Sequence, residues 1–267
     1  MASLSVIELG CRDYAEMTAV QGRLVEDRLG GRVPDLLLLL EHPPTYTLGR
    51  RSDPSDLLHD AAWYSERGVA ICDTPRGGKV TFHGPGQLVG YPIIDLRGVG
   101  VQPSGAGRVD VAGFVAGLEE AMAGALAEWG LATGRIDGLT GLWIDDDRPD
   151  RIDFKGADAA SAALGLARGT IRKIGSIGLR IHRGVSSHGL SINVSCELDP
   201  FDWINSCGIE TCRATSIAAE LDDEGPTVEA VGSAVAERIA DEFGMDLRPG
   251  SLDLIGEPEA SNADSVA

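Results

Sequence analysis

The chain has 267 residues, a net charge of −18 and 43% hydrophobic residues, enough to bury a sizeable core in one α/β domain. Its longest leucine run, Leu36 to Leu40, is far shorter than the roughly 20 apolar residues of a membrane span, and the N-terminus lacks the features of a signal peptide. We therefore expect a cytoplasmic protein without a membrane segment, and so acidic a chain is a poor partner for nucleic acid.

The N-terminal part of the chain predicts two strands, a helix and a loop. Ser5 to Leu9 is typical of a short strand, and Asp13 is placed to cap a helix with apolar residues at helical spacing. Asp35 to Glu41 has the composition of a buried strand, which ends before Pro43. After it, Tyr46 to Arg51 forms a small loop motif.

The most informative stretch is Arg76 to Ile93, which reads RGGKVTFHGPGQLVGYPI. It combines basic residues, a double glycine, a histidine and a Gly-Pro-Gly turn. Glycine lacks a Cβ and tolerates positive φ, so such a run predicts a loop whose backbone comes close to a ligand. A structural turn between two strands is the alternative, although it would need only two or three special residues. The apolar end, Leu88 to Ile93, predicts a buried strand that leaves the loop.

Further elements follow in the second half. An alanine-rich helix is predicted from Asp110 to Leu131, and a strand from Gly141 to Asp145. Asp146 to Gly169 has the composition of an inserted loop with room for a short helix near its end. Ile171 to Ile181 and Ser187 to Val194 then predict two adjacent strands joined as a hairpin.

The chain ends with a helix and a polar tail. Thr227 can cap a helix that runs through Phe243. Residues 249–267 are polar and acidic, and we expect them to be disordered. The predicted catalytic domain is therefore residues 1–248, interrupted by the insertion at 146–169.

Charge is unevenly distributed along the chain. Ala214 to Ala267 contains thirteen acidic and two basic residues, whereas Ile171 to Leu190 contains four basic residues and no acid. A basic segment in an acidic protein can steer an acidic protein partner. Solvated arginines on the exposed face of a strand would give the same pattern, and charge alone does not separate these interpretations.

The cysteines do not suggest a disulfide framework or a zinc site, because there are five and none forms a Cys-x-x-Cys pair. Cys11, Cys72 and Cys196 lie in apolar or strand-like contexts and are expected to serve in packing, while the role of Cys212 stays open. Cys207 is the candidate nucleophile.

Cys207 and Lys173 form the predicted reactive pair. A thiolate is a strong nucleophile toward acyl carbonyls, and a nearby cation favours the thiolate. The chain has only three lysines, and lysine, unlike arginine, can release a proton to shuttle it between reactants. The structural alternatives are a small buried hydrophobe for Cys207 and a surface lysine on an edge strand for Lys173.

Four blocks together resemble the lipoyl(octanoyl) transferase family: Arg76–Ile93, Ile171–Gly178, Ser187–Val194 and Asn205–Ile209. The resemblance runs from about residue 6 to residue 212. It implies a mixed β-sheet packed against helices, similar to the catalytic fold of lipoate–protein and biotin–protein ligases. It also implies transfer of an octanoyl group from acyl carrier protein to a lipoyl-domain lysine, without a cofactor.

The resemblance names Cys207 as the acyl-thioester site and Lys173 as its partner. The expected acceptors are the lipoyl domains of 2-oxoacid dehydrogenase complexes and the glycine cleavage H protein, and we expect a monomer. The residues expected to contact the substrate are Arg76, Gly77, Gly78, Lys79, Val80, Thr81, Phe82, His83, Ser176, Ile177, Gly178, His188, Gly189, Leu190 and Ser191.

Departures from the family pattern are confined to small residues. Ser206 stands where the family commonly has proline before the cysteine, which loosens the expected preorganisation of the loop. Ser191, Gly175 and Ser176 stand where alanines are frequent. These changes concern positioning and chain-length preference rather than the class of reaction.

Alternative functions follow from the same residues. His83 is a second candidate base, which could also bond a substrate carbonyl or orient Lys173, or be a satisfied structural histidine. Cys207 with His188 and Asn193 would suit a cysteine hydrolase. An ATP-dependent lipoate–protein ligase and a non-catalytic module that binds acyl carriers or lipoyl domains are the remaining candidates; the chain has no Walker-type phosphate loop, but such ligases do not require one.

Overall fold

The computed structural model of the chain describes residues 2–99, 109–146, 153–154, 165–205, 212–222 and 225–256. Within these ranges a mixed main sheet has the strand order β13-β1-β2-β6-β11-β10-β8-β7-β9, and β12 pairs with β10. Its strands are β1 Ser3–Cys11, β2 Asp35–Glu41, β6 Gln87–Ile93, β7 Gly134–Ile136, β8 Leu139–Asp145, β9 Asp153–Phe154, β10 Ile171–His182, β11 Val185–Asn193, β12 Arg213–Ala214 and β13 Asp246–Pro249.

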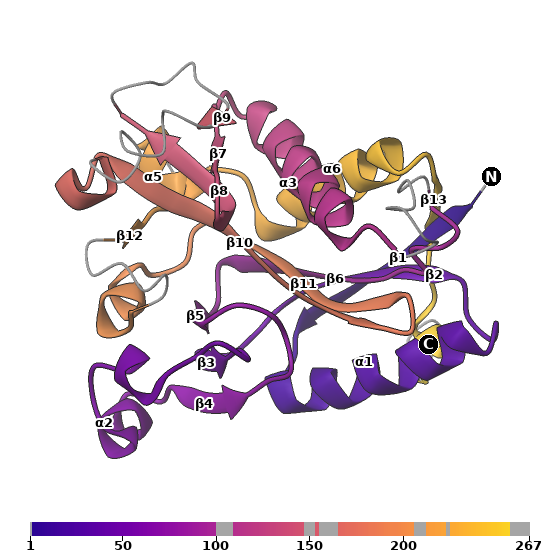
Figure 1. Cartoon of the computed structure of the whole chain (residues 1–267), viewed down its shortest axis with the longest axis horizontal. Coiled ribbons are helices and arrows are strands. Elements are labelled where there is room, and N and C mark those ends of the chain that lie inside the picture. Colours follow the sequence, from indigo (N-terminus) through magenta and orange to yellow (C-terminus); the bar gives the residue numbers. More distant parts are fainter. Residues whose placement is uncertain are drawn as a thin grey trace, which may run out of the picture.

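Helices cover both faces of this sheet (Figure 1). Helix α1 (Tyr14–Leu29) packs on one face, and α3 (Val111–Ala127) and α6 (Val228–Glu242) pack on the other. A short helix, α5 (Ile217–Leu221), follows β12. The structure confirms the predicted mixed sheet packed against helices.

The leucine run of β2 shows why this strand lies in the middle of the fold. Side chains alternate between the two faces of a sheet. Leu37 and Leu39 accordingly join the core beneath α3 and α6, while Leu36, Leu38 and Leu40 join the core beneath α1. All five leucines are buried, because β2 is covered on both faces of the sheet.

A second, smaller sheet lies beside the first and carries part of the glycine-rich block (Figure 1). Its order is β4-β3-β5, with β3 at Thr45–Leu48, β4 at Ala70–Asp73 and β5 at Val80–His83. Helix α2 (Ala61–Glu66) and the 3-10 helix η3 (Asp199–Trp203) close its core. Tyr46 and Phe82 pack there with ring centroids 5.5 Å apart.

The predicted helix starts are confirmed by hydrogen bonds. Asp13, Asp110 and Thr227 each accept a backbone N–H from the first turn of the helix that follows. The predicted hairpin between β10 and β11 is also confirmed. Its turn residues Arg183 and Gly184 both have positive φ, at 50° and 93°, as a two-residue hairpin turn requires.

Several expectations were wrong in detail. Tyr46 to Leu48 belongs to strand β3 rather than to a loop, because it pairs with β4 and β5. The segment expected to be disordered is ordered at its start: β13 reaches Pro249, and the 3-10 helix η4 (Leu252–Ile255) buries Ile255 against the core under α1. Cys11 is exposed rather than packed.

Most of the predicted insertion, 146–169, and the end of the tail, 257–267, lie outside the described residues. Two residues of the insertion form β9, which pairs with β7. Among the helices in the described ranges, none combines the length and apolar character needed to cross a membrane.

Candidate active site

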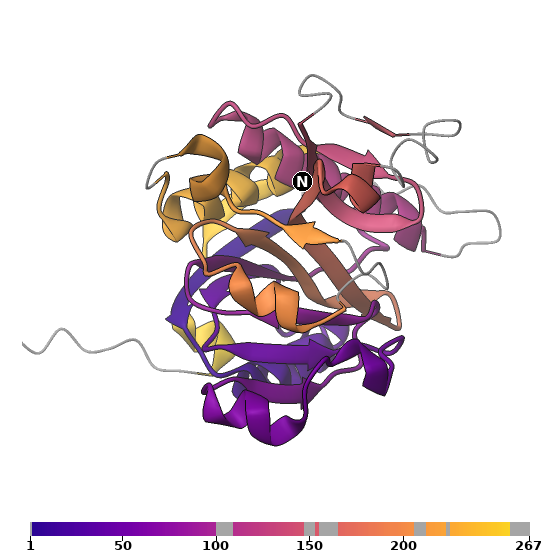
Figure 2. The ribbon, with the colours of Figure 1, turned by 90° about the vertical axis from the view of Figure 1, so that its left-hand side faces the viewer.

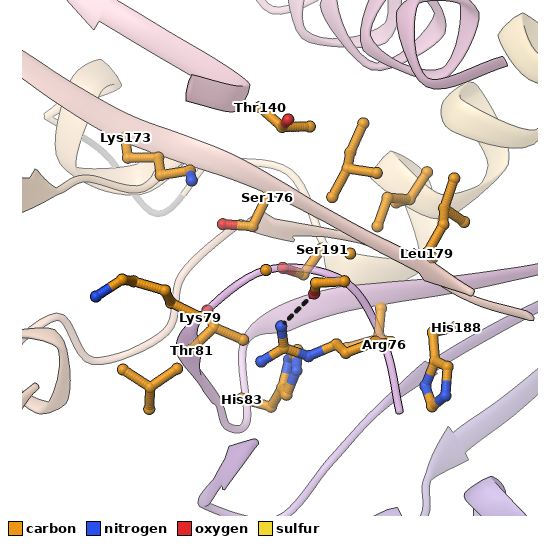
Figure 3. Close-up of a pocket in the computed structure, with 18 of the residues that line it drawn as sticks. Arg76, Lys79, Thr81, His83, Thr140, Lys173, Ser176, Leu179, His188 and Ser191 are labelled. Carbon is orange, nitrogen blue, oxygen red and sulfur yellow. Dashed lines mark hydrogen bonds between the residues drawn. The ribbon is translucent and has the colours of Figure 1, made fainter. Parts of the chain in front are cut away.

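A cavity of about 380 Å³ opens where the small sheet meets β10 and β11 of the main sheet. This volume falls in the range of small-molecule sites, roughly 300–1,000 Å³. Figure 3 shows Lys173 and Ser176 on the side of β10 that faces Lys79, Thr81 and Arg76. The cavity is lined by almost every predicted substrate residue: Arg76, Gly77, Gly78, Lys79, Val80, Thr81, His83, Ser176, Ile177, Gly178, His188, Gly189, Leu190 and Ser191.

Glycine allows the loop of the first block to lie directly on β10. The N–H of Gly77 donates to the carbonyl of Leu179 at 2.9 Å. A Cβ on Gly178 would lie 3.0 Å from the carbonyl oxygen of Gly77, and a Cβ on Gly49 would lie 2.4 Å from that of Gly78. The predicted close backbone approach therefore exists, and it joins the two sheets at the cavity.

Arg76 is a buried cation at this junction. Its Nε and Nη2 donate to the hydroxyl of Thr47 at 3.1 and 2.7 Å, Nη2 also donates to the Thr47 carbonyl, and Nη1 donates to the carbonyl of Gly77 at 2.9 Å. Burial lowers its pKa, which the nearby Tyr14 and Tyr91 partly oppose. In the described part of the chain its hydrogen bonds go to neutral oxygens, so the guanidinium brings positive charge to the cavity wall.

Lys173 reaches the same cavity from β10. Its Nζ lies 5.0 Å from the ring centroid of Trp143, within the range of a cation–π contact. The residue pairs with Trp143 on β8 and with Ala214 on β12. Because neighbouring strands flank it on both sides, its main chain is held in the sheet rather than at an edge. The interpretation of Lys173 as an edge-strand lysine is therefore wrong.

Lys79 has a buried carboxylate partner. Its Nζ lies 2.8 Å from Asp56, which is 1% exposed. Asp56 also accepts the backbone N–H of Asp53 at 2.8 Å. The positive charge of Lys79 is therefore largely offset at the cavity wall.

The buried side-chain amides of Asn193 and Gln87 form a chain of hydrogen bonds that ends at His83, and their partners fix the orientation of each amide. Asn193 Nδ2 donates to the carbonyl of Thr215 at 2.8 Å, and Gln87 Nε2 donates to the carbonyl of Phe82 at 3.1 Å. Carbonyl oxygens only accept, so both amides have a single possible orientation. Gln87 Nε2 also donates to Asn193 Oδ1 at 2.9 Å, which leaves Gln87 Oε1 to accept from His83 Nδ1 at 2.7 Å.

The tautomer of His83 follows from this chain. Its proton lies on Nδ1 and is committed to Gln87, so Nε2 carries a lone pair. Burial, together with His42 and Arg76, lowers the pKa of His83 to about 3, and the ring is neutral near pH 7. Nε2 has no hydrogen-bond partner among the described residues and can only accept. This tautomer favours His83 as an acceptor over a donor to a substrate carbonyl.

His188 lies on the floor of the cavity in a strained conformation. Its φ is +55°, which is uncommon for a residue with a side chain, and its N–H donates to Oε1 of Gln21 on α1 at 2.6 Å. Burial, then Arg76 and Arg180, lower its pKa to about 4. Gln21 thus stabilises a backbone kink that directs β11 past the cavity.

Phe82 and Cys207 are the predicted site residues that do not line the cavity in the described structure. Phe82 is 3% exposed and packs against Tyr46 and Phe201 in the small core, because alternate residues of β5 face away from the cavity. Cys207 lies outside the described residues, as do Ser206 and Gly208.

Both flanks of residues 206–211 reach the cavity. Phe201 of η3 lines it on one side, and Cys212, Arg213 and Ala214 line it on the other. Strand β12 contacts η3, and η3 contacts β5 (Figure 2). Described residues before and after the segment of the predicted nucleophile therefore line the cavity.

The sequence did not predict the cavity residues that lie outside the four blocks. Tyr14 of α1, Arg51, Val111 and Val115 of α3, and Gly138 to Thr140 also line the cavity. Apart from Arg51, which ends the small loop motif Tyr46–Arg51, these residues belong to no motif, and only the fold brings them there. Within the described ranges, no three histidine, cysteine or acidic side chains are grouped as a metal site would require.

The sequence matches the family described as "Lipoyl protein ligase A/B catalytic domain" over residues 13–240. The Octanoyltransferase of Acidobacterium capsulatum is 39% identical over 244 residues, covering 90% of this chain and 90% of that protein. The Octanoyltransferase of Mycobacterium leprae is 41% identical over 241 residues, covering 90% and 87%. That of Chloroflexus aggregans is 38% identical over 250 residues, covering 93% and 98%.

Solved structures share the fold at low sequence identity. The bipartite lipoate protein ligase of Thermoplasma acidophilum has a TM-score of 0.68 at 13% identity, covering 96% of this chain and 91% of its own. A lipoate-protein ligase A bound with ATP has a TM-score of 0.63 at 12% identity, covering 96% and 92%.

The chain belongs to the lipoyl protein ligase A/B catalytic-domain family. Within this family it is an acyltransferase of the lipoyl(octanoyl) transferase type, as the four sequence blocks predicted.

Proposed function

We propose that this enzyme transfers an octanoyl group from acyl carrier protein to the lysine of a lipoyl domain through a thioester on Cys207. One observation carries the proposal: the cavity that joins Lys173 to the Arg76–His83 block is also lined by Phe201 and Cys212, which precede and follow the segment that contains Cys207. The similarity to proteins named Octanoyltransferase supports the identity of the acyl group.

The proposed reaction has two steps. The Cys207 thiolate attacks the octanoyl carbonyl, a new C–S bond forms, and the carrier thiolate leaves and takes up a proton. The acceptor lysine then attacks the enzyme thioester, so that a C–N bond forms and the C–S bond to Cys207 breaks. Lys173 favours the thiolate by its positive charge and passes protons between the leaving thiol and the attacking amine.

The cavity wall suits an acyl chain. Gly77, Gly178 and Gly189 bring backbone close to the slot, and Ser176 and Ser191 are small. We expect the acceptors to be the lipoyl domains of 2-oxoacid dehydrogenase complexes and the glycine cleavage H protein, and we expect the enzyme to act as a monomer in the cytoplasm. An acyl group that arrives as a thioester is already activated, so the reaction needs no ATP.

A transfer assay tests the proposal. The purified chain is incubated with octanoyl-acyl carrier protein and an unmodified lipoyl domain, without ATP, and the lipoyl domain is weighed by mass spectrometry. We expect octanoyl-lysine on the lipoyl domain and free carrier thiol in equal amounts. Transfer from free octanoate only when ATP is present would indicate a ligase instead, and release of octanoate without transfer would indicate a hydrolase.

A further inference from the structure

We propose that the mouth of the cavity is a positively charged docking surface for an acidic acyl donor, with Arg50, Arg51, Arg180 and Arg213 as its rim arginines. The inference rests on the proposed function, because it concerns how the carrier that delivers the octanoyl group is recognised. The rim arginines contact the carrier and take no part in the chemistry.

The charge of the cavity wall is opposite to that of the whole chain. The chain has a net charge of −18, with 41 acidic residues against 23 lysines and arginines. Among the described residues that line the cavity there is no aspartate or glutamate, and the charged ones are Arg51, Arg76, Lys79, Lys173 and Arg213. An acidic partner is therefore repelled by the molecule as a whole and attracted at the cavity.

Arg51 and Arg213 are the exposed cations of this wall. The charge of Lys79 is offset by Asp56, and Arg76 is buried in the wall. Arg51 extends the positive charge to the mouth from the small sheet, and Arg213 does so from β12. The cationic wall thus continues to the surface on two sides of the cavity.

Arg50 adds to the charge beside Arg51. The N–H groups of Arg50 and Arg51 donate to the carbonyls of Arg76 and Gly78, each at 3.0 Å. Arg50 is also exposed, although it does not line the cavity. The two consecutive arginines are therefore held by their main chain against the loop of the first block.

Arg180 reaches the same region from β10. The N–H of Gly77 donates to the carbonyl of Leu179 at 2.9 Å, so the loop that holds Arg50 lies directly against the end of this strand. Arg180 is exposed, and its charge contributes, after burial and Arg76, to the lowered pKa of His188 on the cavity floor. Its position next to the cavity is thus supported by two separate observations.

The rim arginines differ from other surface arginines in their lack of acidic partners. Arg32 pairs with Asp27 at 2.6 Å and Arg238 pairs with Glu128 at 2.8 Å. None of the four rim arginines forms an ion pair with a carboxylate in the described part of the chain. Their charges are therefore available to a partner protein without the loss of an internal ion pair.

The sign of the charge favours the donor over the acceptor. Acyl carrier protein holds its thioester on an arm that is joined to the protein by a phosphodiester, so an anion travels with the octanoyl group. Arginine is well suited to bind phosphate groups and acidic side chains. The acceptor instead presents a lysine, whose ammonium is repelled by a cationic mouth.

Charge reversal outside the cavity wall tests the docking surface. The variants are Arg50→Glu and Arg180→Glu, neither of which changes a residue that lines the cavity. Arg248→Glu is the matched control, since Arg248 is an exposed arginine of β13, at an edge of the main sheet. Values of kcat and KM are measured with octanoyl-acyl carrier protein and with octanoyl-pantetheine, which has neither the phosphate nor the protein, at about 25 and 300 mM salt.

At low salt we expect each rim variant to raise the KM for octanoyl-acyl carrier protein by about 10-fold, with little change in kcat. Transfer from octanoyl-pantetheine should be unchanged in both variants, and Arg248→Glu should match the wild type with both donors. For the wild type, kcat/KM should fall with added salt for the carrier but not for octanoyl-pantetheine.

Three results would overturn the inference and leave the proposed function intact. They are a wild-type KM for the carrier in both rim variants, an equal loss with both donors, and a rise confined to the KM for the lipoyl domain, which would assign the surface to the acceptor. Failure of the wild-type enzyme to transfer from either donor would contradict the proposed function itself.

Discussion

Arg76 and Lys173 are both cations at the cavity, but their surroundings favour different roles. Arg76 is 7% exposed and its donors are committed to Thr47 and Gly77, so it is a fixed charge in the wall. Lys173 is only half-buried and lies beside the ring of Trp143. An ammonium can lose and regain a proton, whereas a guanidinium does not, so only Lys173 can act in proton transfer.

Lys173→Arg tests this distinction at the level of one residue. The variant keeps the positive charge, so Cys207 should still form a thioester. Proton transfer to and from the acceptor amine should fail, and we expect kcat to fall roughly 100-fold or more. Single-turnover assays that separate acylation from transfer would measure this. Near-normal transfer would show that Lys173 contributes charge alone.

Strands β6 and β11 approach each other closely at Gly189 of β11. A Cβ on Gly189 would lie 2.0 Å from the carbonyl oxygen of Gly90, so the two strands can approach only because that position is glycine. His188 precedes it at positive φ. Gly189 is therefore needed for the close pairing of β6 and β11 at the cavity floor, and not for a turn.

We expect Gly189→Ala to destabilise the fold by about 2–4 kcal/mol, because the methyl group must push β6 and β11 apart or strain β11. Urea unfolding followed by circular dichroism measures the free energy of unfolding. Gly22→Ala is the control, since a Cβ at this position in α1 meets nothing within 4 Å and should be neutral or stabilising. Equal stability of the two variants would contradict the close contact.

Elements with a strong local pattern were predictable from sequence. The five leucines of β2 and the caps Asp13 and Thr227 identify their strand and helices without tertiary information. Strand β3 was missed because its ladder partners, β4 and β5, are set by long-range pairing. The position of Tyr14 in the cavity wall and the hydrogen bond from the His188 N–H to Gln21 both depend on how α1 packs. No local sequence pattern predicts either of them.

At the scale of the whole molecule, charge is less segregated than the sequence suggests. Arg172 pairs with Asp146 and Glu220, so part of the basic segment 171–190 is neutralised within the fold. Arg180 and Arg183 are exposed. Any attraction to an acidic carrier from this segment therefore depends on the exposed arginines, not on Arg172.

Buried histidines give the molecule a predictable response to acid. The pKa values of His83 and His188 are lowered to about 3 and about 4, so the folded protein binds fewer protons than the unfolded chain below about pH 6.5. Stability must then rise with pH across this window and fall as the pH drops through it. At about pH 5 each histidine should cost about 2 kcal/mol of unfolding free energy relative to neutral pH.

The double variant His83→Gln, His188→Asn tests that response, with asparagine chosen because it tolerates positive φ. Its free energy of unfolding should change less between about pH 7 and pH 5 than that of the wild type, by about 4 kcal/mol. Identical acid sensitivity in the two proteins would show that these histidines do not titrate on unfolding.

The most direct measurement is an intact mass of the enzyme after incubation with octanoyl-acyl carrier protein. We expect one octanoyl adduct, which is absent in Cys207→Ala, retained in Cys212→Ala, and discharged when a lipoyl domain is added. The Cys212 variant is the necessary control because Cys212 also lines the cavity. An adduct that persists in Cys207→Ala, or transfer without any cysteine adduct, would contradict a thioester at position 207.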